Sequence, residues 1–185
     1  MLVLASGSPR RRELLALITP EFETLPLDLD ERAITADTPA ALVERLAAAK
    51  AEAAAALRPK DLVLGCDTVV DLDGAVLGKP RNREDAAEML RALSGRAHLV
   101  HTGVCAIRGD ERRSLVETTR VYFGEISAEE LDWYLDTDEP WDKAGGYAVQ
   151  GLAARFIPRI EGCYHNVMGL PVAALYQMLR AFGPY

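Results

Sequence analysis

Three consecutive arginines, Arg10 to Arg12, follow Ser8-Pro9 at the predicted start of the first helix. Serine is a favoured N-cap, and proline is favoured at the first helical position. Each cation in a first turn opposes the helix dipole at about 0.3–1 kcal/mol, whereas a bound anion there meets unpaired N–H groups, the dipole and guanidinium groups. The pattern favours a phosphate site, and the alternative is a solvated arginine run.

Asp67 directly follows the apolar stretch 61–66, so we expect it at the end of a buried strand beside this turn. A carboxylate there suits a metal ligand or a proton acceptor for water, and a turn-capping aspartate is the alternative. Lys50 lies four residues after Leu46 on an apolar helix stripe, so it either extends to solvent or reaches the pocket. Lys79 lies in a Gly-Lys-Pro turn, which alone is typical of an exposed lysine.

Short apolar runs alternate with amphipathic, capped segments along the chain, which predicts an α/β fold with a mixed sheet. The Ser8, Thr38, Asn82 and Ser127 segments are typical helix starts, with Glu130 completing a capping box. The predicted strands are 2–5, 61–66, 69–72, 75–77, 97–107, 114–123 and one near 155–157, and the predicted helices begin at these four caps and at about 171.

The composition narrows the class of protein. The chain has 185 residues, 49% of them hydrophobic, and a net charge of −7, which argues against a nucleic-acid polymer or a membrane as partner. Its three cysteines form no C-x-x-C pair, and its short apolar start differs from a signal peptide, so we expect a reduced, cytoplasmic protein. With no linker-like segment, a single domain over 1–185 is expected. Its histidines are expected to serve packing or to lie at the surface.

Six segments together resemble the Maf family of nucleoside triphosphate pyrophosphatases. They occur in family order between residues 4 and 171, at 4–15, 65–70, 78–80, 93–102, 142–151 and 169–171. The resemblance implies a Maf/Ham1 (ITPase-like) fold, an elongated mixed β-sheet flanked by helices with two lobes around a cleft. It also implies hydrolysis between the α- and β-phosphates of a nucleotide, with a divalent cation, Mg²⁺ or Mn²⁺, as cofactor.

The resemblance also implies roles for individual residues. Asp67 matches the proton acceptor, and the other matching pocket positions are Ser8, Arg11, Glu31, Lys50, Lys79 and either Asp142 or Lys143. We further expect Glu31 and Asp67 to hold part of the metal, and Arg12 to join Arg10 and Arg11 at the phosphates. Arg10, Thr68 and Gln150 match the dTTP/UTP type, whereas the 7-methyl-GTP type is expected to have Trp, Gln and Glu there. A glutamine carries both a donor and an acceptor, which suits the N3–H and O4 edge of uracil or thymine.

Other functions are compatible with the same residues. A 7-methyl-GTP pyrophosphatase would keep the fold and change the base. A nucleotide-binding regulator of cell division, a role linked to the family through septum inhibition, would bind without turnover. A structural α/β domain with a solvated arginine run would bind no nucleotide. The resemblance also makes a homodimer plausible.

Overall fold

The computed structural model describes residues 1–184, in which one seven-stranded sheet carries the fold. The strand order is β2-β1-β3-β5-β6-β7. Strand β4 pairs with β3 along the same edge of β3 as β1 does. Pairs β1–β2 and β1–β3 are parallel, while the other pairs are antiparallel, so the expected mixed sheet is confirmed. The strands are β1 (Leu2–Ala5), β2 (Glu23–Thr24), β3 (Leu62–Leu72), β4 (Ala75–Leu77), β5 (Ala97–Arg108), β6 (Glu111–Tyr122) and β7 (Arg159–Glu161).

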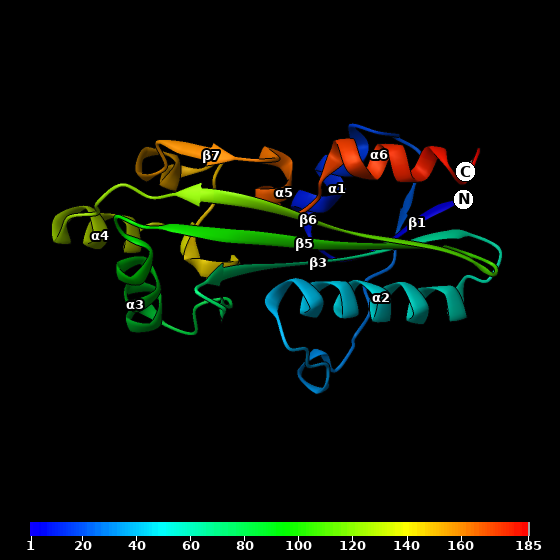
Figure 1. Ribbon diagram of the computed structural model, residues 1–185, viewed down its shortest axis with the longest axis horizontal. Coiled ribbons are helices and arrows are strands. Elements are labelled where there is room, and N and C mark those ends of the chain that lie inside the picture. Colours follow the sequence, from blue (N-terminus) through cyan, green and yellow to red (C-terminus); the bar gives the residue numbers. More distant parts are fainter. Residues whose placement is uncertain (185) are drawn as a thin grey trace.

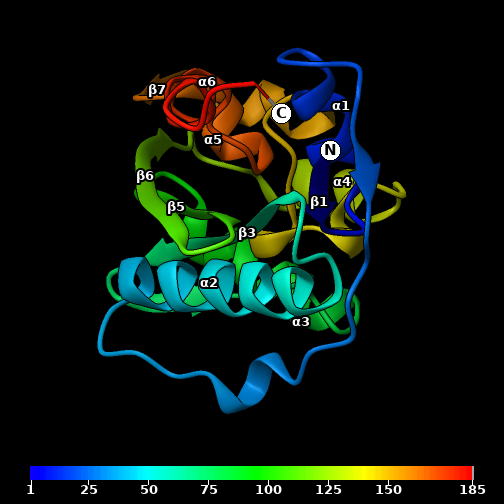
Figure 2. The same cartoon turned by 90° about the vertical axis from the view of Figure 1, so that its right-hand side faces the viewer.

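Helices cover both faces of the sheet (Figures 1 and 2). Helix α2 lies on one face, whereas α1, α5 and α6 lie on the other. Helices α3 and α4 pack at the far end of the long strands β3, β5 and β6 (Figure 1). The helices are α1 (Pro9–Ala16), α2 (Pro39–Leu57), α3 (Arg83–Leu93), α4 (Ala128–Leu135), α5 (Tyr164–Met168) and α6 (Val172–Arg180), with 3₁₀ turns η1 (Glu31–Ala33), η2 (Pro140–Asp142), η3 (Ala144–Gly146) and η4 (Leu152–Phe156).

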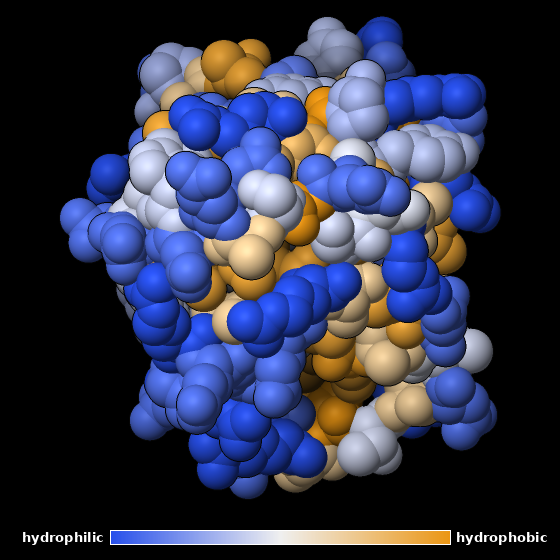
Figure 3. Space-filling model, turned by 90° about the vertical axis from the view of Figure 1, so that its left-hand side faces the viewer, coloured by the Kyte–Doolittle hydropathy of each residue, from blue (hydrophilic) through white to orange (hydrophobic). Residues whose placement is uncertain are grey.

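The buried side chains gather at the two ends of the sheet. One cluster joins α3 and α4 to the far halves of β3, β5 and β6, with Tyr134 and Leu90 fully buried. Two further clusters lie on opposite faces at the other end, one against α1 and α6 and one against α2. Apolar residues also reach the surface in a strip at the α3–α4 end, bordered by hydrophilic ones (Figure 3). Within residues 1–184, every helix is too short or too polar to cross a bilayer.

Strand β3 differs from its prediction. It continues without a break from Leu62 to Leu72, so Asp67 lies in mid-strand and not at a strand end. Its unbroken pairing with β5, from Val63 to Asp71, keeps these residues in one strand. Along its other edge, however, β3 pairs with β1 only as far as Gly65, and its pairing with β4 starts at Val70. Residues 66–69 therefore lie at a gap in the sheet, beside the loop that follows β1.

The second wrong assignment is the strand expected near 155–157. The segment Leu152–Phe156 is a 3₁₀ turn, and the strand follows at Arg159–Glu161, where it pairs with β6. The carboxylate of Glu139 accepts the N–H groups of Leu152 and Ala153, so this segment has non-strand partners for its backbone. The four predicted caps are confirmed, including the reciprocal Ser127–Glu130 capping box.

Candidate active site

The gap in the sheet opens into a cavity of about 900 Å³. Its walls come from the β1–α1 loop, α2, the middle of β3, the turn after β4, and the segments 142–150 and 167–169. This is the carboxyl end of β1, the place where α/β sheets present ligands. The residues predicted for the site that line the cavity are Ser8, Arg10, Arg11, Glu31, Lys50, Asp67, Thr68, Lys79, Lys143 and Gln150.

Asp67, Lys50 and Glu31 form a charged cluster on the α2 side of the sheet. Alternation along β3 places Asp67 on the same face as Gly65, whose Cα lies against α2. Lys50 Nζ in α2 lies 2.6 Å from Asp67 Oδ1 and 2.9 Å from Glu31 Oε1. Lys50 and Asp67 are nearly buried, with side chains 13% and 12% exposed, and Glu31 is half exposed. Lys50 thus reaches the cavity and offsets two carboxylates.

Arg11 approaches Thr68 from the opposite face. Its Nε donates to the carbonyl of Gly169 at 3.0 Å, and its Nη2 donates to Thr68 Oγ1 at 3.1 Å. A third, longer bond joins Nη1 to Ser6 Oγ at 3.4 Å. Ser8 caps α1 by accepting the backbone N–H of Arg11 at 3.4 Å. The guanidinium is therefore fixed at the base of the cavity by groups from three parts of the chain.

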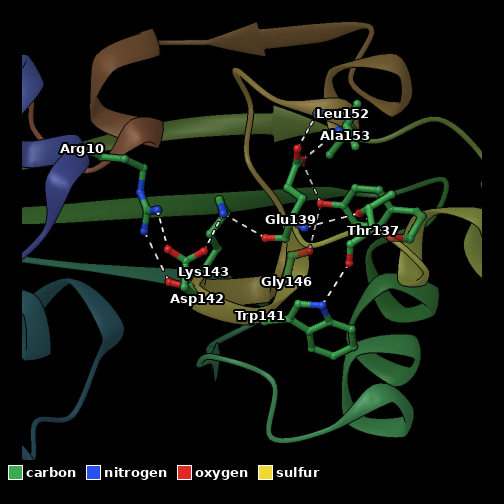
Figure 4. A network of polar contacts seen from close by, with 10 residues as sticks. Arg10, Thr137, Glu139, Trp141, Asp142, Lys143, Gly146, Leu152 and Ala153 are labelled. Atoms are coloured by element: carbon green, nitrogen blue, oxygen red, sulfur yellow. Dashed lines mark hydrogen bonds and ion pairs between the residues drawn. The ribbon is translucent and has the colours of Figure 1, made fainter.

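Arg10 crosses the cavity to Asp142 (Figure 4). Its Nη1 lies 2.8 Å from Asp142 Oδ2, and Lys143 Nζ contacts the other carboxylate oxygen. Partial burial disfavours the ionised form of Asp142, but the hydrogen bonds from Lys143 and Arg10 outweigh it and lower the pKa of this carboxyl to about 2. Asp142 is therefore the counter-ion of two cations proposed to meet phosphate.

Glu139 organises the same wall and was missed from the sequence. Its carboxylate accepts the Tyr134 hydroxyl at 2.9 Å and the backbone N–H groups of Leu152 and Ala153, while its carbonyl accepts Lys143 Nζ at 2.9 Å (Figure 4). Glu139 lies in the sequence Asp-Glu-Pro, a composition typical of an exposed loop, so the sequence carries no signal of this role. Its effect is to fix the segment that carries Gln150 and Lys143.

The remaining predicted residues lie at the rim. Lys79 and Gln150 are exposed and line the cavity from opposite segments. Arg12 is exposed and lies outside the cavity lining, because the next position along α1 points about 100° away from Arg11. Of the three arginines, the structure brings two into the cavity.

The donors present suit a hard divalent cation. Asp67 and Glu31 supply carboxylate oxygens on one side of the cavity, and Mg²⁺ is commonly held by one or two carboxylates plus substrate phosphates. No cluster of three or more His, Cys, Asp and Glu side chains arranged for a metal occurs within residues 1–184. The two carboxylates thus fit a cation whose coordination the substrate's phosphates complete.

Two of the histidines serve packing. His98 is buried, contacts the Tyr147 hydroxyl at 2.6 Å and packs edge-on against the rings of Phe123 and Tyr147. His101 is buried between Asp71 and Thr118. Both lie in the interior, in line with the first of the two places expected for the histidines, packing or the surface.

Sheet topology and cleft together define an α/β protein with the architecture of Ham1 proteins. The Ham1 protein of Staphylococcus aureus superposes with a TM-score of 0.58 at 16% identity, covering 98% of both chains. A Ham1 protein from Coxiella burnetii gives the same TM-score at 14% identity, covering 97% of this chain and 98% of its own. At these identities the likeness concerns the fold, and it confirms the expected Ham1-type architecture.

The chain itself belongs to the Maf family, since the family model described as Maf-like protein matches residues 1–182. A protein of Symbiobacterium thermophilum named dTTP/UTP pyrophosphatase is 51% identical over 182 residues, which cover 98% of this chain and 94% of the relative. A protein of the same name from Vibrio cholerae is 48% identical, covering 98% and 97%. The family resemblance inferred from the six segments is confirmed.

Proposed function

We propose that this chain is a nucleoside triphosphate pyrophosphatase that converts dTTP and UTP to the monophosphate and pyrophosphate. The observation that carries the proposal is the meeting, in one cleft, of a buried Asp67–Lys50 pair with the fixed guanidinium of Arg11. The name shared by its full-length relatives supports the pyrimidine substrates. We further propose that residues 1–185 act as a single domain in the cytoplasm, and a homodimer stays a prediction from the resemblance.

In the proposed reaction, Asp67 orients a water molecule and accepts one of its protons. The water oxygen attacks the α-phosphorus, the bond from this phosphorus to the α–β bridging oxygen breaks, and pyrophosphate leaves. Lys50 holds Asp67 in place, while Arg10, Arg11, Lys79 and Lys143 offset the charge of the triphosphate. A divalent cation held by Asp67 and Glu31 would polarise the α-phosphate and acidify the water.

Base selection is assigned to Gln150. Its exposed amide at the cavity rim offers both a donor and an acceptor, as the uracil edge requires. Cytosine reverses donor and acceptor at this edge and would leave polar groups unpaired once the bound base covers them, at about 1–3 kcal/mol per group. Arg10, the second position typical of the dTTP/UTP type, is proposed to exchange Asp142 for phosphate.

Replacement of Asp67 by Asn tests the proposal. Asn keeps the size of the side chain but accepts no proton, so kcat for dTTP and UTP should fall by about 10²- to 10⁴-fold. Pyrophosphate release is measured on dTTP, UTP, CTP, GTP and 7-methyl-GTP. The control is Asp73→Asn. Asp73 lies in the turn between β3 and β4, and its exposed carboxylate pairs with Arg96.

Near wild-type turnover by Asp67→Asn would remove this residue from the chemistry. Equal or faster turnover of a purine nucleotide would contradict the pyrimidine assignment. Binding of nucleotides with no turnover of any would favour the regulator over the enzyme.

A further inference from the structure

A chain of hydrogen bonds runs from the half-buried Arg11 guanidinium into the interior of the sheet, where its last bond is buried. Thr68 Oγ1, which accepts Arg11 Nη2, lies 2.9 Å from Thr102 Oγ1 on β5. Thr102 Oγ1 donates to the backbone carbonyl of Asn166 at 3.1 Å. With that proton committed, Thr102 accepts from Thr68, and Thr68 accepts from Arg11. The Thr68 hydroxyl also lies 3.4 Å from the Gly169 carbonyl oxygen, and its contact with Thr102 is the shorter of the two.

Asn166 anchors the far end of this chain. Its side chain is fully buried, and its two amide hydrogens go to the Val100 carbonyl on β5 at 3.0 Å and to Thr119 Oγ1 on β6 at 2.9 Å. These bonds pin α5 against the sheet. The same helix ends at Gly169, whose left-handed backbone turns its carbonyl toward Arg11 Nε. Asn166 thus supports two of the three groups that accept hydrogen bonds from Arg11, namely Thr68 and the Gly169 carbonyl.

The arrangement leaves Arg11 partly free for a ligand. Of the five N–H donors of a guanidinium, three are used by Gly169, Ser6 and Thr68 among the described residues, which leaves two. Fixing the other three removes rotamer freedom before an anion arrives, and preorganised donors stabilise charge without reorganisation. Thr68, by contrast, has its hydroxyl proton committed within the protein.

We propose that Thr102 and Asn166 are positioning residues, which act through Thr68 and Gly169 to hold the Arg11 guanidinium in the geometry that meets the substrate's phosphates. Thr68 consequently contributes to turnover by orienting Arg11. The proposal rests on the proposed function for its kinetic part and on the hydrogen-bond chain for its structural part.

Replacement of Thr102 by Val is the direct test, because it keeps the shape and removes the hydroxyl that links Thr68 to Asn166. Misplacing a binding group by a fraction of an ångström to 1 Å should lower kcat/KM for dTTP and UTP by about 10- to 100-fold. Thr102→Ser keeps the hydroxyl and should restore most of the activity. The control is Thr118→Val, which likewise removes a threonine hydroxyl bonded to a side chain of β5, here from an exposed residue of β6 that contacts His101.

A double-mutant cycle with Arg11→Lys separates positioning from general destabilisation. If Thr102 acts through Arg11, the Thr102→Val change should have little further effect on kcat/KM once Arg11 is Lys. An equal loss in both backgrounds, or a loss no larger than that of Thr118→Val at similar melting temperature, would overturn the proposal.

The Arg11 Nε–H signal in NMR gives a readout independent of turnover. The signal is assigned by its disappearance in Arg11→Lys, and its exchange with solvent should be faster in Thr102→Val and in Thr68→Val than in the wild type and Thr118→Val. Unchanged exchange in both variants would overturn the proposal even if the enzyme is active. A wild type without any pyrophosphatase activity would instead overturn the proposed function, and the exchange comparison would still decide the positioning role.

Discussion

At the scale of single residues, the cleft pairs each inner cation with a carboxylate or a fixed acceptor. Lys50 meets Asp67 and Glu31, Arg10 meets Asp142, and Arg11 meets neutral oxygens. An arriving triphosphate therefore finds one guanidinium with free donors and must displace a carboxylate from another. Gln150 takes no part in these pairs, and its amide is the group proposed to hydrogen-bond the base.

Replacement of Gln150 by Glu removes the amide donor and adds a negative charge at the cavity rim. We expect kcat/KM for dTTP and UTP to fall by about 10- to 100-fold, since one unpaired polar contact costs about 1–3 kcal/mol. The measurement is pyrophosphate release at subsaturating nucleotide. Gln177→Glu, the same change on an exposed position of α6 outside the cavity, should leave the rate unchanged. Equal effects of the two changes would exclude Gln150 from base selection.

At the scale of elements, the close approach of α2 to the sheet brings Lys50 to Asp67. A Cβ built on Gly65 would lie 2.1 Å from the Ala47 carbonyl oxygen, and one on Gly103 would lie 2.3 Å from the Val43 carbonyl oxygen. Two neighbouring strands thus present bare backbone to one helix. Alanines on the facing side of α2, among them the fully buried Ala51, complete the fit.

Gly65→Ala should push α2 away from the sheet and carry Lys50 with it. Overpacking of this kind costs about 1–3 kcal/mol, and we expect a similar loss in the free energy of unfolding together with a reduced kcat. Urea unfolding and pyrophosphate release measure the two effects. In Gly124→Ala the new methyl group lies 3.7 Å from its nearest neighbour, the Phe156 carbonyl oxygen, so this variant should resemble the wild type in both. A stable, fully active Gly65→Ala would show that α2 can shift without cost.

At the scale of the whole molecule, the cleft lies between the cores at the two ends of the sheet. The far core includes the His98–Phe123–Tyr147 cluster, and Tyr147 also lines the cavity. Burial lowers the pKa of His98 to about 4. The unfolded chain takes up this proton near pH 6.5, whereas the folded chain takes it up only near pH 4. Between these values the unfolded state binds more protons, so stability falls as the pH falls.

His98→Phe should therefore flatten the pH dependence of stability between about pH 6.5 and pH 4, by up to about 1.4 kcal/mol per pH unit relative to the wild type. The free energy of unfolding in urea is measured across this window. Tyr147→Phe removes the hydroxyl partner but keeps the imidazole, so it should be less stable yet retain the wild-type slope. Identical slopes in His98→Phe and the wild type would show that His98 does not titrate as described.

The sequence alone determined the features that depend on neighbours along the chain. The helix caps and the cationic first turn after Ser8 can be recognised from local backbone chemistry, and six motifs identified the family. Only the tertiary structure decided that β3 passes Asp67 without ending, that Arg12 points away, and that Asp142, Glu139 and Asn166 hold the cleft's cations and walls. Those outcomes depend on contacts between residues as distant as 10 and 142, which arise from packing of whole elements and leave no local pattern.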